Sequence, residues 1–131
     1  MAKVYVGARL LLGLIFTVFG LNGLLMFTIG KGFIPMPPPP PEMAEIMNGF
    51  MKTGYLLQLV KLLEVVGGVL LLTGKYQRLA LTLLAPIVVN ILGIHLFAER
   101  SGLPMGVIIT VLTGMLIANQ WKDGFDRLLV K

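Results

Sequence analysis

The sequence lacks cysteine altogether and is poor in charge. Its 131 residues include no cysteine and only 13% charged residues. The absence of cysteine excludes disulfides, thiol redox relays, iron–sulfur clusters and covalent haem attachment through this chain. A soluble domain has about 25% charged residues, whereas this chain is 56% hydrophobic, with a mean hydropathy of +0.90. A globule of this length cannot hide so much apolar surface, so the composition indicates a membrane protein.

Motifs for metals, nucleotides and catalysis are missing as well. There is one histidine and carboxylates are few, so no metal site is expected. The sequence contains no nucleotide-binding loop, catalytic triad or internal repeat. Its basic residues are scattered over the chain, so no nucleic-acid partner is expected. The sequence therefore assigns no catalytic residues and favours a chain that is not an enzyme by itself.

Four long apolar stretches organise the chain. Each is roughly 24–30 Å long at 1.5 Å per residue, which suits a bilayer core of about 30 Å. None shows the period-two alternation of a barrel strand, so helices are expected. We predict an all-α fold, a four-transmembrane-helix bundle forming a single membrane domain over residues 1–131, with spans near 5–29, 55–73, 79–98 and 103–121.

The distribution of basic residues predicts the orientation of the spans. With four spans, one side of the membrane would hold Lys3, Arg9, Lys75, Arg78, Lys122, Arg127 and Lys131. The other side would hold Lys31, Lys52 and Arg100. Because cytoplasmic loops are enriched in Lys and Arg, we expect both termini to be cytoplasmic.

The outer loop at residues 31–54 contains a stiff arm and a short helix. The run Pro37–Pro41 favours polyproline, and Pro41 suits a helix start. Apolar residues then follow at helical spacing, which predicts a short amphipathic helix between the first two spans. We interpret it as an anchor in the membrane interface. The alternative is a lid over the bundle mouth, formed by Met43, Met47 and Phe50.

Polar side chains interrupt the spans at similar heights. Stacking the spans as antiparallel neighbours places six of them in the middle-to-outer part of the membrane: Asn22, Gln58, Lys61, Glu64, Asn90 and His95. A charge at that depth costs about 2.5–3.5 kcal/mol on insertion scales, so such groups face the interior and pair. We predict a polar, ligand-binding intramembrane pocket from these six residues.

A purely structural interpretation competes with the pocket. Lys61 and Glu64 lie at i and i+3 and can pair along one helix face, which would simply hold the helices in register. His95 points about 140° away from Asn90 on a helix, so the two cannot aim at one point. Glu99, one turn later, is placed to orient the His95 ring.

Small residues and one proline predict where helices approach or bend. Pro86 is expected to kink the third span. Gly67 and Gly68 reduce the width of the second span, because glycine has no side chain. In the fourth span a ladder of small residues repeats every four positions and lets another helix approach: Gly102, Gly106, Thr110, Gly114 and Ala118. The sequence favours a neighbour within the bundle over a second copy of the chain, and a homo-oligomer stays open.

The second and third spans carry a recognisable pattern. The stretch Lys61-Leu-Leu-Glu64-Val-Val-Gly67-Gly68, a basic turn, then Ala85-Pro86-Ile-Val-Val-Asn90 and His95, resembles the DoxX family of small four-span membrane proteins. The proline-rich loop followed by Thr53-Gly54-Tyr55 resembles a bacterial branch of that family. The resemblance implies a four-helix membrane bundle and a bacterial inner-membrane location, with a glutamate at Glu64 and polar residues at Asn90 and His95.

The resemblance also implies two kinds of function. Some DoxX-like proteins are similar to the membrane subunit of thiosulfate:quinone oxidoreductase or are linked with redox complexes, whereas distant relatives act as cargo receptors or assembly chaperones. Related bundles with thiol–quinone chemistry need cysteines, which this chain lacks. We therefore expect an accessory subunit of a membrane redox complex whose pocket takes a quinone or a lipid-like small molecule. The alternative is a non-enzymatic scaffold or chaperone that packs against partner spans.

Overall fold

The computed structural model describes residues 2–98, 100–121 and 124, and this part of the chain is helical with no strand. The elements are α1 (Ala2–Ile29), α2 (Pro41–Met51), α3 (Leu56–Thr73), α4 (Gln77–Phe97), the short 3₁₀ helix η1 (Arg100–Gly102) and α5 (Leu103–Trp121). The predicted all-α fold, with a short helix between the first two spans, is confirmed. Helix α1 begins three residues before the predicted start of its span, and α4 begins two residues before.

Four helical segments are long and apolar enough to cross a membrane: α1, α3, α4 and the continuous segment Arg100–Trp121. Many large apolar side chains on these helices point outward. Leu14 is 53% exposed, Val89 is 69% exposed and Val111 is 54% exposed. Side chains of this kind are stable in lipid and costly in water. The chain is therefore a multi-pass integral membrane protein.

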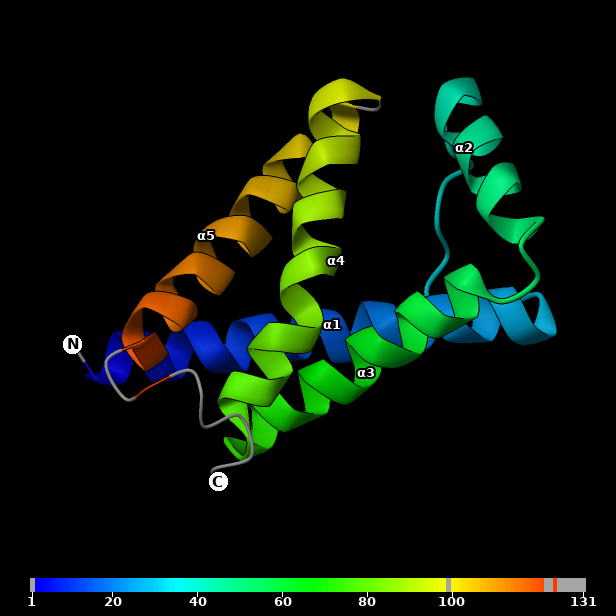
Figure 1. Ribbon diagram of the computed structural model, residues 1–131. Coiled ribbons are helices and arrows are strands. Elements are labelled where there is room, and N and C mark those ends of the chain that lie inside the picture. The colour runs from blue at the N-terminus through cyan, green and yellow to red at the C-terminus, as the bar shows by residue number, and fades with distance from the viewer. Residues whose placement is uncertain (1, 99, 122–123, 125–131) are drawn as a thin grey trace.

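The spans are arranged as two helix pairs (Figure 1). Helix α1 packs along α3, and α4 packs along α5. The pairs meet near the start of α1, where α5 contacts α1 and where α3 turns into α4, and they diverge toward the other end of the molecule. Contacts shared by all four spans are therefore concentrated at the end where the pairs meet.

The common core lies at that meeting end. It is built from buried apolar side chains of all four spans: Ala8, Leu12, Phe16, Leu71, Ala80, Leu81, Leu84, Val88, Ile109 and Leu116. Gly67 of α3 faces α4 at this core, and a Cβ on Gly67 would lie 2.7 Å from Leu84 Cγ. The glycine therefore lets α4 approach α3 closely, as its small size predicts.

The turn between α3 and α4 is tight and is held by an arginine. Gly74 ends α3 with φ of +76°, in the left-handed region that glycine adopts at little cost. Tyr76, the residue immediately before α4, is also left-handed, with φ of +53°. The Arg9 guanidinium of α1 donates to the carbonyls of Leu71 and Leu72 in the last turn of α3. A cation is favourable there because the last carbonyls of a helix lack partners and carry partial negative charge.

Helix α2 follows the proline arm and lies beside only one span. It begins at Pro41 with Glu42 in its first turn, and among the described elements its neighbour is α3. In Figure 1 it stands off the far end of the α1–α3 pair and runs across the direction of that pair. Met43, Met47 and Phe50 are partly buried, and no residue of α2 is fully buried. The anchor and the lid both remain predictions.

Candidate functional site

Asn22 ties the outer loop to the first span. Its side chain is 3% exposed, and its Oδ1 accepts a hydrogen bond of 2.9 Å from the backbone N–H of Ile34. The loop packs closely around this amide, since a Cβ on Gly32 would collide with Asn22 Oδ1. Asn22 therefore satisfies a loop donor that lies against the helix.

Gln58 bridges the outer ends of α1 and α3. Its Nε2 donates to the carbonyl oxygen of Phe27 at 2.9 Å. Phe27 lies in the last turn of α1, where backbone carbonyls lack a partner within the helix. A side-chain donor at this position completes the hydrogen bonding of α1 and fixes α3 beside it.

Lys61 and Glu64 form an ion pair on α3. Lys61 Nζ lies 2.9 Å from Glu64 Oε2, with side-chain exposures of 24% and 5%. The Oε2 atom is buried and has no hydrogen-bond partner among the described groups besides this ion pair. The Glu64 carboxylate is therefore neutralised by a nearby charge while its oxygen keeps unused accepting capacity.

Glycines of α1 make room for this ion pair. A Cβ on Gly20 would lie 3.0 Å from Glu64 Cβ, and one on Gly23 would lie 2.7 Å from Lys61 Cδ. The Lys61 stem thus runs over Gly23, and the ion pair is seated against the backbone of α1. Its position at the α1–α3 contact agrees with the expectation that intramembrane charges face protein.

Asn90 and His95 lie on α4 and face different surroundings. Asn90 is exposed, and its Nδ2 donates to the carbonyl of Pro86 at 2.8 Å. The His95 ring packs against η1 and the start of α5. A Cβ on Gly102 of η1 would collide with the ring, and one on Gly106 of α5 would lie 3.3 Å from His95 Cδ2. Glu99, which was expected to orient the ring, lies outside the described residues.

The six predicted site residues therefore divide into groups. Four gather along the α1–α3 contact: Asn22, Gln58, Lys61 and Glu64. His95 lies between α4 and α5, and Asn90 points outward from α4. The small-residue ladder of α5 divides in the same way. Gly102 and Gly106 receive His95 within the chain, whereas a Cβ on Gly114 would meet nothing within 4 Å.

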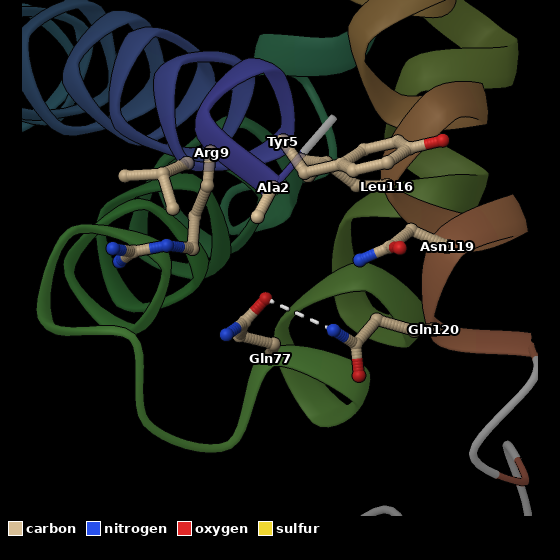
Figure 2. A pocket seen from close by; sticks show the side chains of 8 residues that line it. Ala2, Tyr5, Arg9, Gln77, Leu116, Asn119 and Gln120 are labelled. Atoms are coloured by element: carbon tan, nitrogen blue, oxygen red, sulfur yellow. Dashed lines mark hydrogen bonds between the residues drawn. The ribbon is translucent and has the colours of Figure 1, made fainter.

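A cavity of about 240 Å³ lies at the opposite end of the spans, between the starts of α1 and α4 and the end of α5. Figure 2 shows its polar lining, which includes Tyr5, Arg9, Gln77, Asn119 and Gln120. Gln120 Nε2 donates to Gln77 Oε1 at 3.3 Å across it. Sequence reasoning missed this cavity because polar residues at span ends are ordinary at a membrane interface. Among the residues that the structure places, no group of three or more His, Cys, Asp or Glu could hold a metal ion.

Comparison with known proteins shows to which family the chain belongs. The DoxX family model matches residues 5–99. The chain belongs to the DoxX family. No curated protein and no solved structure matches the chain.

The DoxX match covers α1 to α4 and ends before α5. All six predicted site residues lie within the matched range, whereas Asn119 and Gln120 of the cavity lie beyond it. The resemblance noted in the second and third spans is thus confirmed.

Proposed function

We propose that this DoxX protein is an accessory subunit of a membrane redox complex and holds a quinone or a lipid-like small molecule beside Lys61 and Glu64. The observation that carries the proposal is the ion pair of 2.9 Å within a membrane-spanning helix. Keeping two charges in a span is expensive, and such groups mark functional sites more often than neutral residues do.

The chemistry of the pair suits a quinone head group. The Lys61 ammonium has three N–H donors and side-chain exposure of 24%, so it can donate to a quinone carbonyl while it neutralises Glu64. The Glu64 Oε2 atom is itself buried, so the carboxylate would hold the Lys61 ammonium in place beside the head group. Asn22 and Gln58 would hold the surrounding backbone in place through their bonds to Ile34 and Phe27.

Native mass spectrometry from mild detergent tests this proposal. We expect wild type to retain a small lipid-like mass that Glu64→Gln abolishes. Glu45→Gln is the matched control, because Glu45 is an exposed carboxylate on α2 and its loss should leave the bound mass unchanged. A bare wild-type protein, or a mass unaffected by Glu64→Gln, would refute the quinone site.

The double variant Lys61→Met/Glu64→Gln separates binding from folding. Removing both charges of a buried ion pair avoids the uncompensated charge that a single substitution leaves behind. We expect this variant to fold, as checked by circular dichroism, and to lose the bound mass. Retention of the mass would mean that the ion pair contributes only to helix packing and not to ligand binding.

The second candidate function is a scaffold for partner spans, and the exposed face of α4 favours it. Asn90 Oδ1 accepts no hydrogen bond from the described residues, and a Cβ on Gly93, one turn later, would meet nothing within 4 Å. An amide oxygen free to accept a hydrogen bond, beside a small residue, is typical of a contact between transmembrane helices. The partner would be a transmembrane helix with a polar side chain at that depth.

Pull-down in mild detergent distinguishes the scaffold from the quinone site. The scaffold predicts a stable partner that Asn90→Leu releases and that Glu64→Gln leaves bound. Thr82→Val is the control, because Thr82 is exposed on the same helix and its hydroxyl already donates to Arg78 O at 2.8 Å. Equal recovery of the partner with Asn90→Leu and with Thr82→Val would reject this face.

We also propose that the protein lies in a bacterial inner membrane with both termini in the cytoplasm. The support is the excess of Lys and Arg on the side that holds the N-terminus and the α3–α4 turn. The absence of cysteine makes the test direct, since single cysteines can be introduced without background. In intact cells a membrane-impermeant maleimide should label Lys52→Cys and spare Lys75→Cys. The reverse pattern would invert the topology.

A further inference from the structure

The cavity at the start of α1 is a built polar site that the quinone proposal does not use. Its volume of about 240 Å³ is below the roughly 300–1,000 Å³ of pockets that enclose a whole drug-sized ligand. It therefore suits a head group whose remaining atoms stay outside. The lining comes from the first helical residues of α1 and α4 and the last of α5, which is the depth of lipid head groups rather than of acyl chains.

The lining residues that the structure describes are rich in donors and include no carboxylate. Arg9 supplies a positive charge, and only its Nη1 is used by the carbonyls of Leu71 and Leu72. The amide of Asn119 and the hydroxyl of Tyr5 have no hydrogen-bond partner within the described parts of the chain. A guanidinium with neutral amides and a phenol is a donor set that favours phosphate oxygens over cations.

The charged residues around the cavity are mostly basic, like Arg9 in its lining. The basic residues described at this end of the spans are Lys3, Arg9, Lys75 and Arg78. The acidic residues that the structure describes are Glu42, Glu45 and Glu64, which lie on the outer helix and in the middle of α3. By the predicted topology this side of the membrane carries seven Lys and Arg against Asp123 and Asp126, so its net charge is positive and attracts anions.

One side of the cavity borders exposed apolar residues of α1, which would face the acyl chains of the surrounding lipid. Val6 lines the cavity and is 46% exposed, and Leu10, one turn further along α1, is 42% exposed. Trp121, at the end of α5, is 69% exposed, in the position that indoles take at the membrane interface. A molecule with an anionic head in the cavity would lay its tails along this apolar side of α1.

We propose that this cavity binds the phosphate-containing head group of an anionic phospholipid. Arg9 and Asn119 would donate to the phosphate, and Gln77 and Gln120 would contact the glycerol hydroxyls. The site is independent of the quinone proposal, because it lies at the other end of the spans and shares no residue with the Lys61–Glu64 pair.

Lipid competition measured by native mass spectrometry tests the site. Wild-type protein in mild detergent is given equal amounts of phosphatidylglycerol and phosphatidylcholine. We expect phosphatidylglycerol to be retained at least about fivefold more often than phosphatidylcholine. This is roughly the preference that one basic residue near the membrane surface provides. Arg9→Gln and, separately, Asn119→Leu should bring the ratio to about one. The control is Arg100→Gln, which removes a basic residue at the opposite end of the spans.

Asn119→Leu keeps the test informative if Arg9→Gln fails to fold, because Asn119 makes no bond on which a helix depends. Equal retention of the two lipids by wild type would overturn the proposal. A preference for phosphatidylglycerol that both variants preserve would also overturn it. Displacement of the lipid by excess inorganic phosphate would assign the cavity to a soluble anion and reject the phospholipid.

Discussion

Gly13 of α1 and Gly68 of α3 face each other across the contact between these helices. A Cβ on either residue would lie 2.9 Å from the backbone oxygen of the other. A Cβ on Gly68 would also lie 2.7 Å from the backbone nitrogen of Thr17. Side chains therefore do not separate the two helices at this crossing, and the close approach seats the polar residues of α3 against α1.

Gly68→Ala should loosen this crossing. The added methyl meets backbone atoms, which cannot move aside as a flexible side chain would, so the helices must separate. We expect a loss of about 1–3 kcal/mol, typical of overpacking, seen as a lower Tm by circular dichroism in detergent. Gly114→Ala is the matched control, since its Cβ has open space and alanine is favoured in a helix by about 1 kcal/mol. Equal Tm values for the two variants would contradict the assigned contact.

The membrane helices could be predicted because each depends on properties local in the sequence. A long apolar run predicts a span whatever its neighbours are. Helix α2 could be predicted from the proline arm before it and from the helical spacing of its apolar residues. The Lys61–Glu64 pair was likewise predicted from its i, i+3 spacing, and the structure contains it at 2.9 Å. Local spacing also explains why Asn90 and His95 face different surroundings.

Which polar residues come together depends on which helices pack against each other. The depth of each residue in the membrane does not determine that packing. Antiparallel stacking places Gln58 level with His95, yet the structure pairs Gln58 with Phe27 of α1. The reason is that α3 and α4 share contacts near their turn and diverge beyond it (Figure 1). The cavity around Arg9 likewise depends on how the ends of three helices meet, which no single segment encodes.

Asn22→Leu should release the outer loop. The substitution removes the acceptor of the part-buried Ile34 N–H, and an unsatisfied donor costs up to about 1–3 kcal/mol when it is fully buried. Trypsin should then cleave after Lys31 at least about fivefold faster, because the loop opens more often. Thr28→Val is the control, since the Thr28 hydroxyl bonds within its own helix to Leu24 O at 2.7 Å. Unchanged cleavage in Asn22→Leu would show that Asn22 does not hold the loop.

Lys61→Met should destabilise the protein more than the removal of both charges does. The single substitution leaves the Glu64 carboxylate, 5% exposed, without its cation, and breaking a buried pair in this way costs about 3–5 kcal/mol. Lys61→Met/Glu64→Gln should regain most of that loss. Thermal unfolding of wild type and both variants in one detergent measures the difference. A double variant no more stable than Lys61→Met would mean that the pair does not couple the two residues.

Gly102→Ala should disturb the packing of α4 against η1 and the start of α5 through the His95 ring. The three atoms nearest to a Cβ on Gly102 all belong to the His95 ring, and the Cβ would collide with them. We expect Gly102→Ala to cost about 1–3 kcal/mol in wild type and close to nothing in a His95→Ala background, where the ring is absent. The double-mutant cycle, measured by thermal unfolding, therefore predicts a coupling of about 1 kcal/mol or more, as found for residues in contact. Gly114→Ala in both backgrounds is the control and should show no coupling, because that position lies away from His95 and is open. Additive effects of Gly102→Ala and His95→Ala would place the ring elsewhere and remove the reason for small residues at this end of α5.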